Sequence, residues 1–226
     1  MRSPSPPWSS SLAAAEIAEH PDDGLGRPRP VLVWRFDAPR RAASTAVLGG
    51  GLGDRSWVVN AEVVLDYDHH DPAAHLRAIA GGLGLAGDGV GLLTAARVLD
   101  VTTAEDEGVR CDATVGITTP TWAAAPEGDW SRWVPGTINA VCQVPAPLTD
   151  AALLNAIVTA TEAKSQALHE RGVPGTGTAS DAVVVVCPLG STDPYGGPRS
   201  TWGARLARAV HAAVAEGADR FHARRS

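Results

Sequence analysis

Two asparagines are the first residues in this sequence whose type and position suggest chemistry. Asn60 and Asn139 are two of only three asparagines in the chain, and both lie in runs typical of β-strands, where asparagine is disfavoured. An asparagine in such a place either satisfies buried backbone groups or donates hydrogen bonds to the amide of a ligand. We predict a catalytic role for Asn139 and a substrate-binding role for Asn60, with purely structural roles as the alternative.

The single lysine of the chain, Lys164, is a second candidate. The other eighteen of its nineteen basic residues are arginines, as a GC-rich coding background produces, so a lysine that remains is more informative than usual. Glu162 and Lys164 lie two residues apart on an expected helix and point to different faces, so they do not pair with each other. Lys164 can instead hold a carboxylate such as Asp181, or donate a proton itself. We predict catalytic roles for Glu162, Lys164 and Asp181, against the alternative of a solvated helix flank.

A loop interrupted by glycines carries several hydroxyl groups and leads into an apolar strand. Thr176, Thr178 and Ser180 precede Asp181 there, and such a loop can bind an oxyanion or an amide through its hydroxyls and backbone N–H groups. The structural alternative is a turn whose hydroxyls cap backbone groups. The substrate-binding residues that we predict are Asn60, Thr94, Thr137, Thr176, Thr178 and Ser180.

Metal ligands are few in the sequence. His69 and His70 are adjacent and would face opposite sides of a strand, although a small cluster of His70 or Asp71 with His75 is the alternative. The three cysteines, which include no C-x-x-C pair, lie in apolar surroundings and are expected to be buried, unreactive thiols. We therefore expect no metal site.

An α+β scaffold has to position these residues. Strands are expected at 31–36, 45–48, 57–65, 90–96, 109–117, 138–144 and 181–187. Helices are expected at 72–83 after the N-cap Asp71, at 150–170 after the N-cap Thr149, and at 199–215. Because several strands precede clustered helices, we predict a single layered α+β domain with a mostly antiparallel or mixed sheet packed by helices. Residues 1–28 are expected to form a flexible N-terminal arm and residues 29–226 the folded domain.

The composition excludes several classes of protein. A net charge of −6 offers no basic surface for nucleic acid, and no apolar run reaches the ~18–20 residues that span a bilayer. The N-terminus lacks the apolar region of a signal peptide, so a cytoplasmic protein is expected. Three of the seven tryptophans, Trp122, Trp130 and Trp133, fall in an expected loop. They either pack on a broad apolar ligand or close the edge of the core.

Four segments, in order over about residues 45–215, resemble the adenosylcobinamide amidohydrolase family. The first runs from Val59-Asn60 through Val64-Leu65-Asp66-Tyr67 to Asp71-Pro72, and the second is Gly91-Leu92-Leu93-Thr94-Ala95-Ala96. The third is Pro135-Gly136-Thr137-Ile138-Asn139, followed by Thr159-Ala160-Thr161-Glu162-Ala163-Lys164. The fourth is Thr176-Gly177-Thr178-Ala179-Ser180-Asp181-Ala182, with Tyr195-Gly196-Gly197-Pro198 and Gly203 downstream. Ser180 stands where the family usually has threonine, which keeps the hydroxyl.

The resemblance implies hydrolysis of adenosylcobinamide to adenosylcobyric acid and (R)-1-aminopropan-2-ol, a step of corrinoid salvage for cobalamin biosynthesis. The corrinoid is then the substrate and small-molecule partner, and no cofactor is expected; a homo-oligomer is compatible with the sequence. Two alternatives stay open. One is a hydrolase that cleaves its own chain after Gly136 and uses Thr137 as an N-terminal nucleophile, and the other is a corrinoid-binding protein without catalysis.

Overall fold

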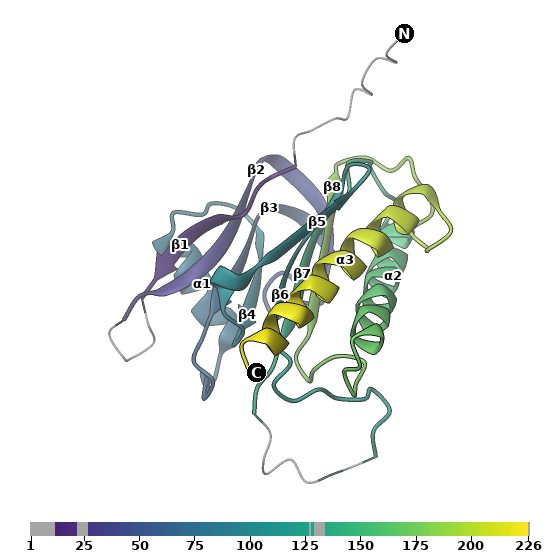
Figure 1. Cartoon of the computed structure of the whole chain (residues 1–226). Helices are drawn as coiled ribbons and strands as arrows, with labels where there is room; N and C mark the ends of the chain where they lie inside the picture. Colours follow the sequence, from purple (N-terminus) through teal and green to yellow (C-terminus); the bar gives the residue numbers. More distant parts are fainter. Residues whose placement is uncertain (1–11, 22–26, 127, 129–133, 226) are drawn as a thin grey trace.

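We describe the protein from a computed structural model, which places residues 12–21, 27–126, 128 and 134–225. One eight-stranded mixed sheet forms its centre, in the order β4-β3-β2-β8-β7-β6-β5, with β1 paired to β2 at the side (Figure 1). The strands are β1 (Glu16–His20), β2 (Arg29–Ser44), β3 (Gly51–Glu62), β4 (Gly89–Thr94), β5 (Thr102–Asp106), β6 (Val109–Val115), β7 (Ile138–Gln143) and β8 (Ala182–Pro188). The helices are α1 (Pro72–Gly82), η1 (Val98–Asp100), α2 (Asp150–Glu170) and α3 (Thr201–Ala223). The predicted α+β domain with a mixed sheet is therefore confirmed.

Both faces of the central strands are buried. In β8 the side chains alternate, so that Val183 and Val185 face α2 and α3, which lie side by side in Figure 1, while Val184 and Val186 face the opposite side. This period of two is the rule for strands, and burial of both faces explains the continuous apolar run of β8. We call the side away from α2 and α3 the inner face of the sheet.

The sheet bends strongly around its inner face. Two bonds join strands that are not neighbours in the sheet: Trp34 Nε1 of β2 donates to Asp112 Oδ2 of β6 at 2.9 Å, and Asn60 Nδ2 of β3 donates to Thr114 Oγ1 of β6 at 2.9 Å. β2 makes the bend because its register on β3 shifts between Arg35 and Arg40, so its first half pairs with β1 and its second half with β8. The pairing between β2 and β3 is interrupted around Pro39, whose backbone nitrogen has no hydrogen to donate to a neighbouring strand.

Two of the three helix predictions agree with the structure at their starts. Asp71 accepts a hydrogen bond from the backbone N–H of Ala74 and begins α1, and Thr149 caps α2, which spans the predicted 150–170. α3 begins two residues later than predicted and runs to Ala223, eight residues further. Among the described residues, no helix has the length and apolar character needed to cross a membrane.

The strand predictions differ from the structure in three places. The strand expected at 45–48 is wrong, because β2 ends at Ser44 and the chain turns through Gly49 and Gly51, which have positive φ values of 70° and 79°. Strands β1 and β5 were not predicted. β1 lies inside the segment expected to be a free arm, and its antiparallel pairing with β2 ties it to the sheet. Residues 1–11 and 22–26 of that segment lie outside the described residues.

Candidate functional site

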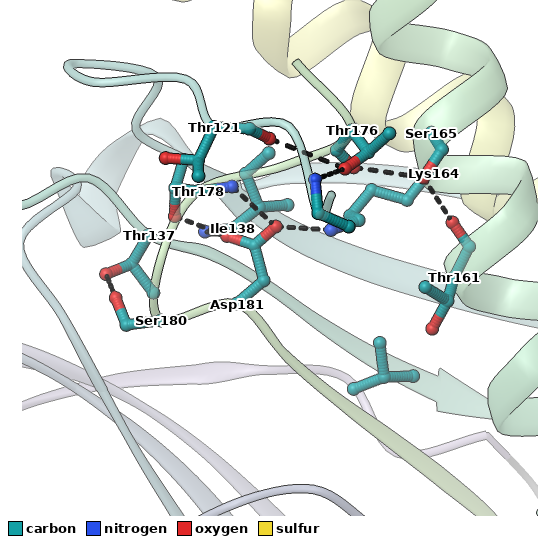
Figure 2. Close-up of polar contacts among 12 residues, drawn as sticks. Thr121, Thr137, Ile138, Thr161, Lys164, Ser165, Thr176, Thr178, Ser180 and Asp181 are labelled. Atoms are coloured by element: carbon teal, nitrogen blue, oxygen red, sulfur yellow. Dashed lines mark hydrogen bonds and ion pairs between the residues drawn. The ribbon is translucent and has the colours of Figure 1, made fainter. Parts of the chain in front are cut away.

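The carboxylate of Asp181 is the centre of the polar cluster in Figure 2. Asp181 directly precedes β8, and its side chain is 10% exposed. Oδ1 accepts from the backbone N–H of Ile138 at 2.9 Å, and Oδ2 accepts from the backbone N–H of Thr178 at 3.0 Å. The Thr178 hydroxyl lies against Oδ1, and Lys164 Nζ donates to Oδ2. Donors therefore surround the carboxylate, as a buried charge requires.

Lys164 reaches Asp181 because of its place on α2. The helix packs on the sheet, and Lys164 is on the packed side with only 6% of its surface exposed. Figure 2 shows its side chain directed at Asp181. The predicted contact between Lys164 and Asp181 is therefore confirmed. Glu162 lies on the exposed side of the same helix and makes no polar contact with the described residues, so the structure does not bring it to the cluster.

Gly136 and the hydroxyl groups of the neighbouring loop form a short chain of hydrogen bonds. The Ser180 hydroxyl donates to the Gly136 carbonyl at 3.1 Å, and Thr137 Oγ1 lies 2.9 Å from Ser180 Oγ. Because Ser180 has a single hydroxyl proton, Thr137 is the donor in the second bond. The Thr178 hydroxyl is 2.6 Å from the same carbonyl. It also has one proton, which it shares between Gly136 and Asp181.

Two buried asparagines form a second polar group on the inner face. Asn139 Nδ2 donates to Asn60 Oδ1 and to the carbonyl of Leu93, both at 2.9 Å, and Asn60 in turn donates to Thr114. Asn60 and Asn139 are each 1% exposed. Asn139 Oδ1 is buried and has no hydrogen-bond partner within the described chain. An unpaired buried acceptor costs about 1–3 kcal/mol, so this atom is available for a donor on a ligand.

These two groups meet at one cavity of about 410 Å³. Its polar wall contains Thr94, Thr137, Asn139, Ser180 and Asp181, and its apolar wall includes residues of the segments 63–67 and 92–95. Thr94 Oγ1 accepts from the backbone N–H of Ala96 at 3.0 Å, which fixes the turn after β4. The structure thus brings together predicted site residues that are far apart in the sequence.

Other predicted site residues lie beside the cavity and support its walls. Thr176 pairs with Thr121 through a backbone N–H···O bond of 3.0 Å, and its hydroxyl accepts from the backbone N–H of Ala123 at 3.0 Å. Its carbonyl accepts from Ser165 of α2 at 2.9 Å, a bond drawn in Figure 2. Thr176 therefore holds the loop 176–181 to its neighbours and does not line the cavity, unlike the substrate contact that was predicted.

The segment 67–75, where a small metal cluster was weighed, is occupied by other contacts. Tyr67 Oη lies 3.0 Å from His75 Nδ1, and His69 Nδ1 accepts from the backbone N–H of Asp71 at 3.1 Å. Within the described ranges there is no group of three or more His, Cys, Asp or Glu side chains suited to a metal ion. Trp122 is half-exposed and lines neither large cavity, and Trp130 and Trp133 lie outside the described residues.

The sequence reasoning missed three groups of the site: the carbonyls of Gly136 and Leu93, and the side chain of Thr114. Carbonyl groups carry no side-chain signal. Thr114, however, lies directly opposite Asn139 in the antiparallel β6–β7 register, so a predicted pairing of these strands would have suggested it.

Comparison with known proteins follows the same segments. A family model described as adenosylcobinamide amidohydrolase matches residues 14–226. A Methanosarcina mazei protein named adenosylcobinamide amidohydrolase is 32% identical over 179 residues, covering 75% of this chain and 85% of the relative. A Halobacterium salinarum protein of the same name is 42% identical over 109 residues, covering 45% of this chain and 46% of the relative. A crystal structure of a Pyrococcus horikoshii protein aligns with 93% of this chain and 84% of its own at 12% identity and a TM-score of 0.47.

Proposed function

This chain belongs to the adenosylcobinamide amidohydrolase family, and from that premise we propose that it hydrolyses the amide joining (R)-1-aminopropan-2-ol to the corrinoid in adenosylcobinamide. The products are adenosylcobyric acid and the free amine, which makes the reaction a salvage step for cobalamin biosynthesis. The observation that carries the proposal is the match over residues 14–226, which includes every polar residue of the cavity wall. A cytoplasmic location remains a prediction of the sequence.

The size of the cavity fits one arm of this substrate. Small-molecule sites range over about 300–1,000 Å³, and a cavity of about 410 Å³ is at the lower end of that range. We infer that it takes the amide-bearing arm while the wide corrin ring lies across its mouth. The apolar wall near Val64, Leu65 and Tyr67 is suited to the hydrocarbon part of that arm.

Asn139 provides the contact that selects an amide. Both of its N–H groups are engaged, by Asn60 and by Leu93, so Oδ1 is the one polar atom of this cavity-lining side chain that is left to pair with a ligand. An acceptor of this kind binds the N–H of the scissile amide. An ester has no N–H at that position, so it cannot form this hydrogen bond. Asn60 acts as a positioning residue, because its carbonyl fixes the orientation of the Asn139 amide.

Asp181 is the group that we propose to act on the attacking water. Asp181 lines the cavity, and its carboxylate regains capacity to accept a proton when the Thr178 hydroxyl donates to Gly136 instead. The carboxylate then takes a proton from a water molecule while the oxygen of that water attacks the amide carbon. It returns that proton to the nitrogen when the C–N bond breaks. Lys164 holds the carboxylate in place. Thr137 lines the same wall, and its hydroxyl can donate to the carbonyl oxygen of the substrate once it turns away from Ser180.

The experiment is incubation of the purified protein with adenosylcobinamide, with chromatographic detection of adenosylcobyric acid and of aminopropanol. We expect both products in equal amounts without added metal. Saturable binding of adenosylcobinamide with no release of amine would instead favour the non-catalytic corrinoid-binding protein. Activity that a chelator abolishes and zinc restores would contradict the expectation that no metal is needed.

A further inference from the structure

A second cavity, of about 240 Å³, adjoins the first. Leu65, Ala95 and Pro135 line both cavities, so the two share a wall. The chain passes from one to the other within three residues: Pro135 lines both, Gly136 lines the second and Thr137 lines the first. A ligand group bound in the second cavity would therefore lie next to the polar wall where the amide is cleaved.

The second cavity is rich in positive charge. Its lining includes four arginines, Arg97, Arg220, Arg224 and Arg225, with Asp100 as the one acidic residue among the described residues that line it. The chain as a whole carries a net charge of −6, so the local charge of this group of arginines is opposite in sign to the net charge of the protein. Arginines that converge on a concave surface bind phosphate and carboxylate groups through paired N–H donors.

The acidic partners of these arginines neutralise only part of the charge. Asp100 contacts Arg224 and lies 3.7 Å from Arg97, and Glu216 lies 2.5 Å from Arg220. Arg225 packs over the ring of Phe221, with its guanidinium carbon 5.4 Å from the ring centroid. Within the described residues, two carboxylates thus pair with this group of four arginines. The side chains of Arg97, Arg220 and Arg224 are 65%, 46% and 41% exposed, so they can turn toward a ligand.

The position of this charge relative to the amide identifies the ligand group. If the arm enters the first cavity from the corrin ring, as the proposed function requires, its far end is the aminopropanol part with its hydroxyl. We propose that the second cavity binds a phosphate ester on that hydroxyl, so that the enzyme prefers corrinoids whose aminopropanol arm is phosphorylated. This inference rests on the proposed function and extends its substrate class.

The chemistry of the cleaved bond is unchanged in such a substrate. Water adds to the amide carbon, the C–N bond breaks, and the nitrogen leaves as the protonated amine with its phosphate still attached. The corrinoid product is adenosylcobyric acid as before, and the second product is 1-aminopropan-2-yl phosphate. No oxidant, nucleotide or other co-reactant takes part.

The test compares kcat/KM for adenosylcobinamide with that for its phosphate ester, at low and at high salt. We expect the ester to be the better substrate by about tenfold at low salt, with the preference falling as salt screens the charges. The double variant Arg97→Gln/Arg225→Gln removes two guanidinium groups, and we expect the ratio of the two kcat/KM values to fall close to one. Arg199→Gln, an exposed arginine outside both cavities, is the matched control and should keep the wild-type ratio.

Two outcomes would overturn the assignment while leaving the proposed function intact. One is a wild-type enzyme that releases aminopropanol from adenosylcobinamide but shows no preference for the ester. The other is a preference that persists in the double variant. A third measurement uses inorganic phosphate and follows the Tm of the wild type and of the double variant. If phosphate raises only the wild-type Tm and the ester is no better a substrate, the cavity binds a free anion and the substrate assignment is wrong. Failure of the proposed function is distinct, because then neither corrinoid is cleaved.

Discussion

Lys164 of α2 and Asp181 at the start of β8 form an ion pair that is almost completely buried, with side chains 8% and 10% exposed. Such a pair depends on the shape of both partners as well as on their charge, because the space around it is filled. Gly177 shows how little space there is: a Cβ atom at this position would overlap both Lys164 Nζ and Asp181 Oδ2.

We expect Lys164→Arg to lose turnover nearly as severely as Lys164→Ala, by about 10²-fold or more. The guanidinium keeps the charge but cannot occupy the place of the compact ammonium. The measurement is turnover of adenosylcobinamide by variants whose circular dichroism and unfolding transitions show a folded protein. The pH profile of kcat should also shift, since Lys164 orients the carboxylate that takes the proton.

Gln166→Ala, a substitution on the exposed side of the same helix, is the control and should keep full turnover. Near-normal activity of a folded Lys164→Arg variant would remove Lys164 from the site.

Gly177→Ala is expected to separate Lys164 from Asp181. The added methyl group has to displace buried charged atoms, so we expect a loss of about 1–3 kcal/mol in the free energy of unfolding and at least a tenfold loss of turnover. Urea unfolding and the corrinoid assay measure the two effects. In the matched control, Gly81→Ala in α1, the new methyl meets nothing within 4 Å. It should keep turnover and gain up to about 1 kcal/mol from helix propensity. An unchanged Gly177→Ala enzyme would show that the cluster tolerates rearrangement.

We expect the chain to stay in one piece. In the structure the Gly136 carbonyl accepts from Ser180, and Thr137 donates to Ser180, so the peptide between these residues is held by the loop. Intact mass spectrometry of freshly purified and of stored protein checks this. Two fragments divided between Gly136 and Thr137 would favour the alternative in which Thr137 is an N-terminal nucleophile.

Cys187 should make the stability of the protein depend on pH in the alkaline range. Burial in β8 raises the pKa of its thiol to about 11, from an ordinary value of 9.0. Because the folded pKa is the higher one, the contribution to stability is complete below pH 9 and is lost as the pH rises toward 11. The quantity to follow is the difference in free energy of unfolding between wild type and Cys187→Ala, which we expect to shrink by up to about 2–3 kcal/mol over this range. A difference that does not vary with pH would show that this thiol ionises equally in both states.

The local elements of this fold could be predicted from the sequence, because their signals lie within a few residues. Thr149 and Asp71 mark the starts of α2 and α1, and the apolar run before Pro188 marks β8. β1 and β5 were missed because they are short and carry polar side chains. Their place in the sheet comes from backbone pairing with β2 and β6, and a segment of five residues contains no sequence pattern that indicates such pairing.

The candidate site was predictable in part for a similar reason. Asn60, Asn139 and Asp181 stand out because each is a polar residue in or next to an apolar strand segment. Residues that disagree with their local sequence in this way tend to mark functional sites. Their contacts could not be read from the sequence, since Asn60 and Asn139 are 79 residues apart and meet only because the sheet bends. Glu162 and Lys164 were both predicted from the segment that resembles the family, on different faces of the helix, and only the face of Lys164 packs against the sheet where Asp181 lies.

The bend of the sheet also has a mechanical consequence. The cavity lies where the β3–β4 half of the sheet approaches the β6–β7 half, so its width depends on the curvature of one continuous sheet. Trp34–Asp112 and Asn60–Thr114 are cross-ties that set this curvature from side chains on the inner face. A ligand that needs a wider or a narrower cavity has to strain these hydrogen bonds, whereas a ligand that fits the present width does not. Substitutions at Trp34, whose side chain is not part of the cavity lining, should therefore change substrate affinity through the shape of the sheet alone.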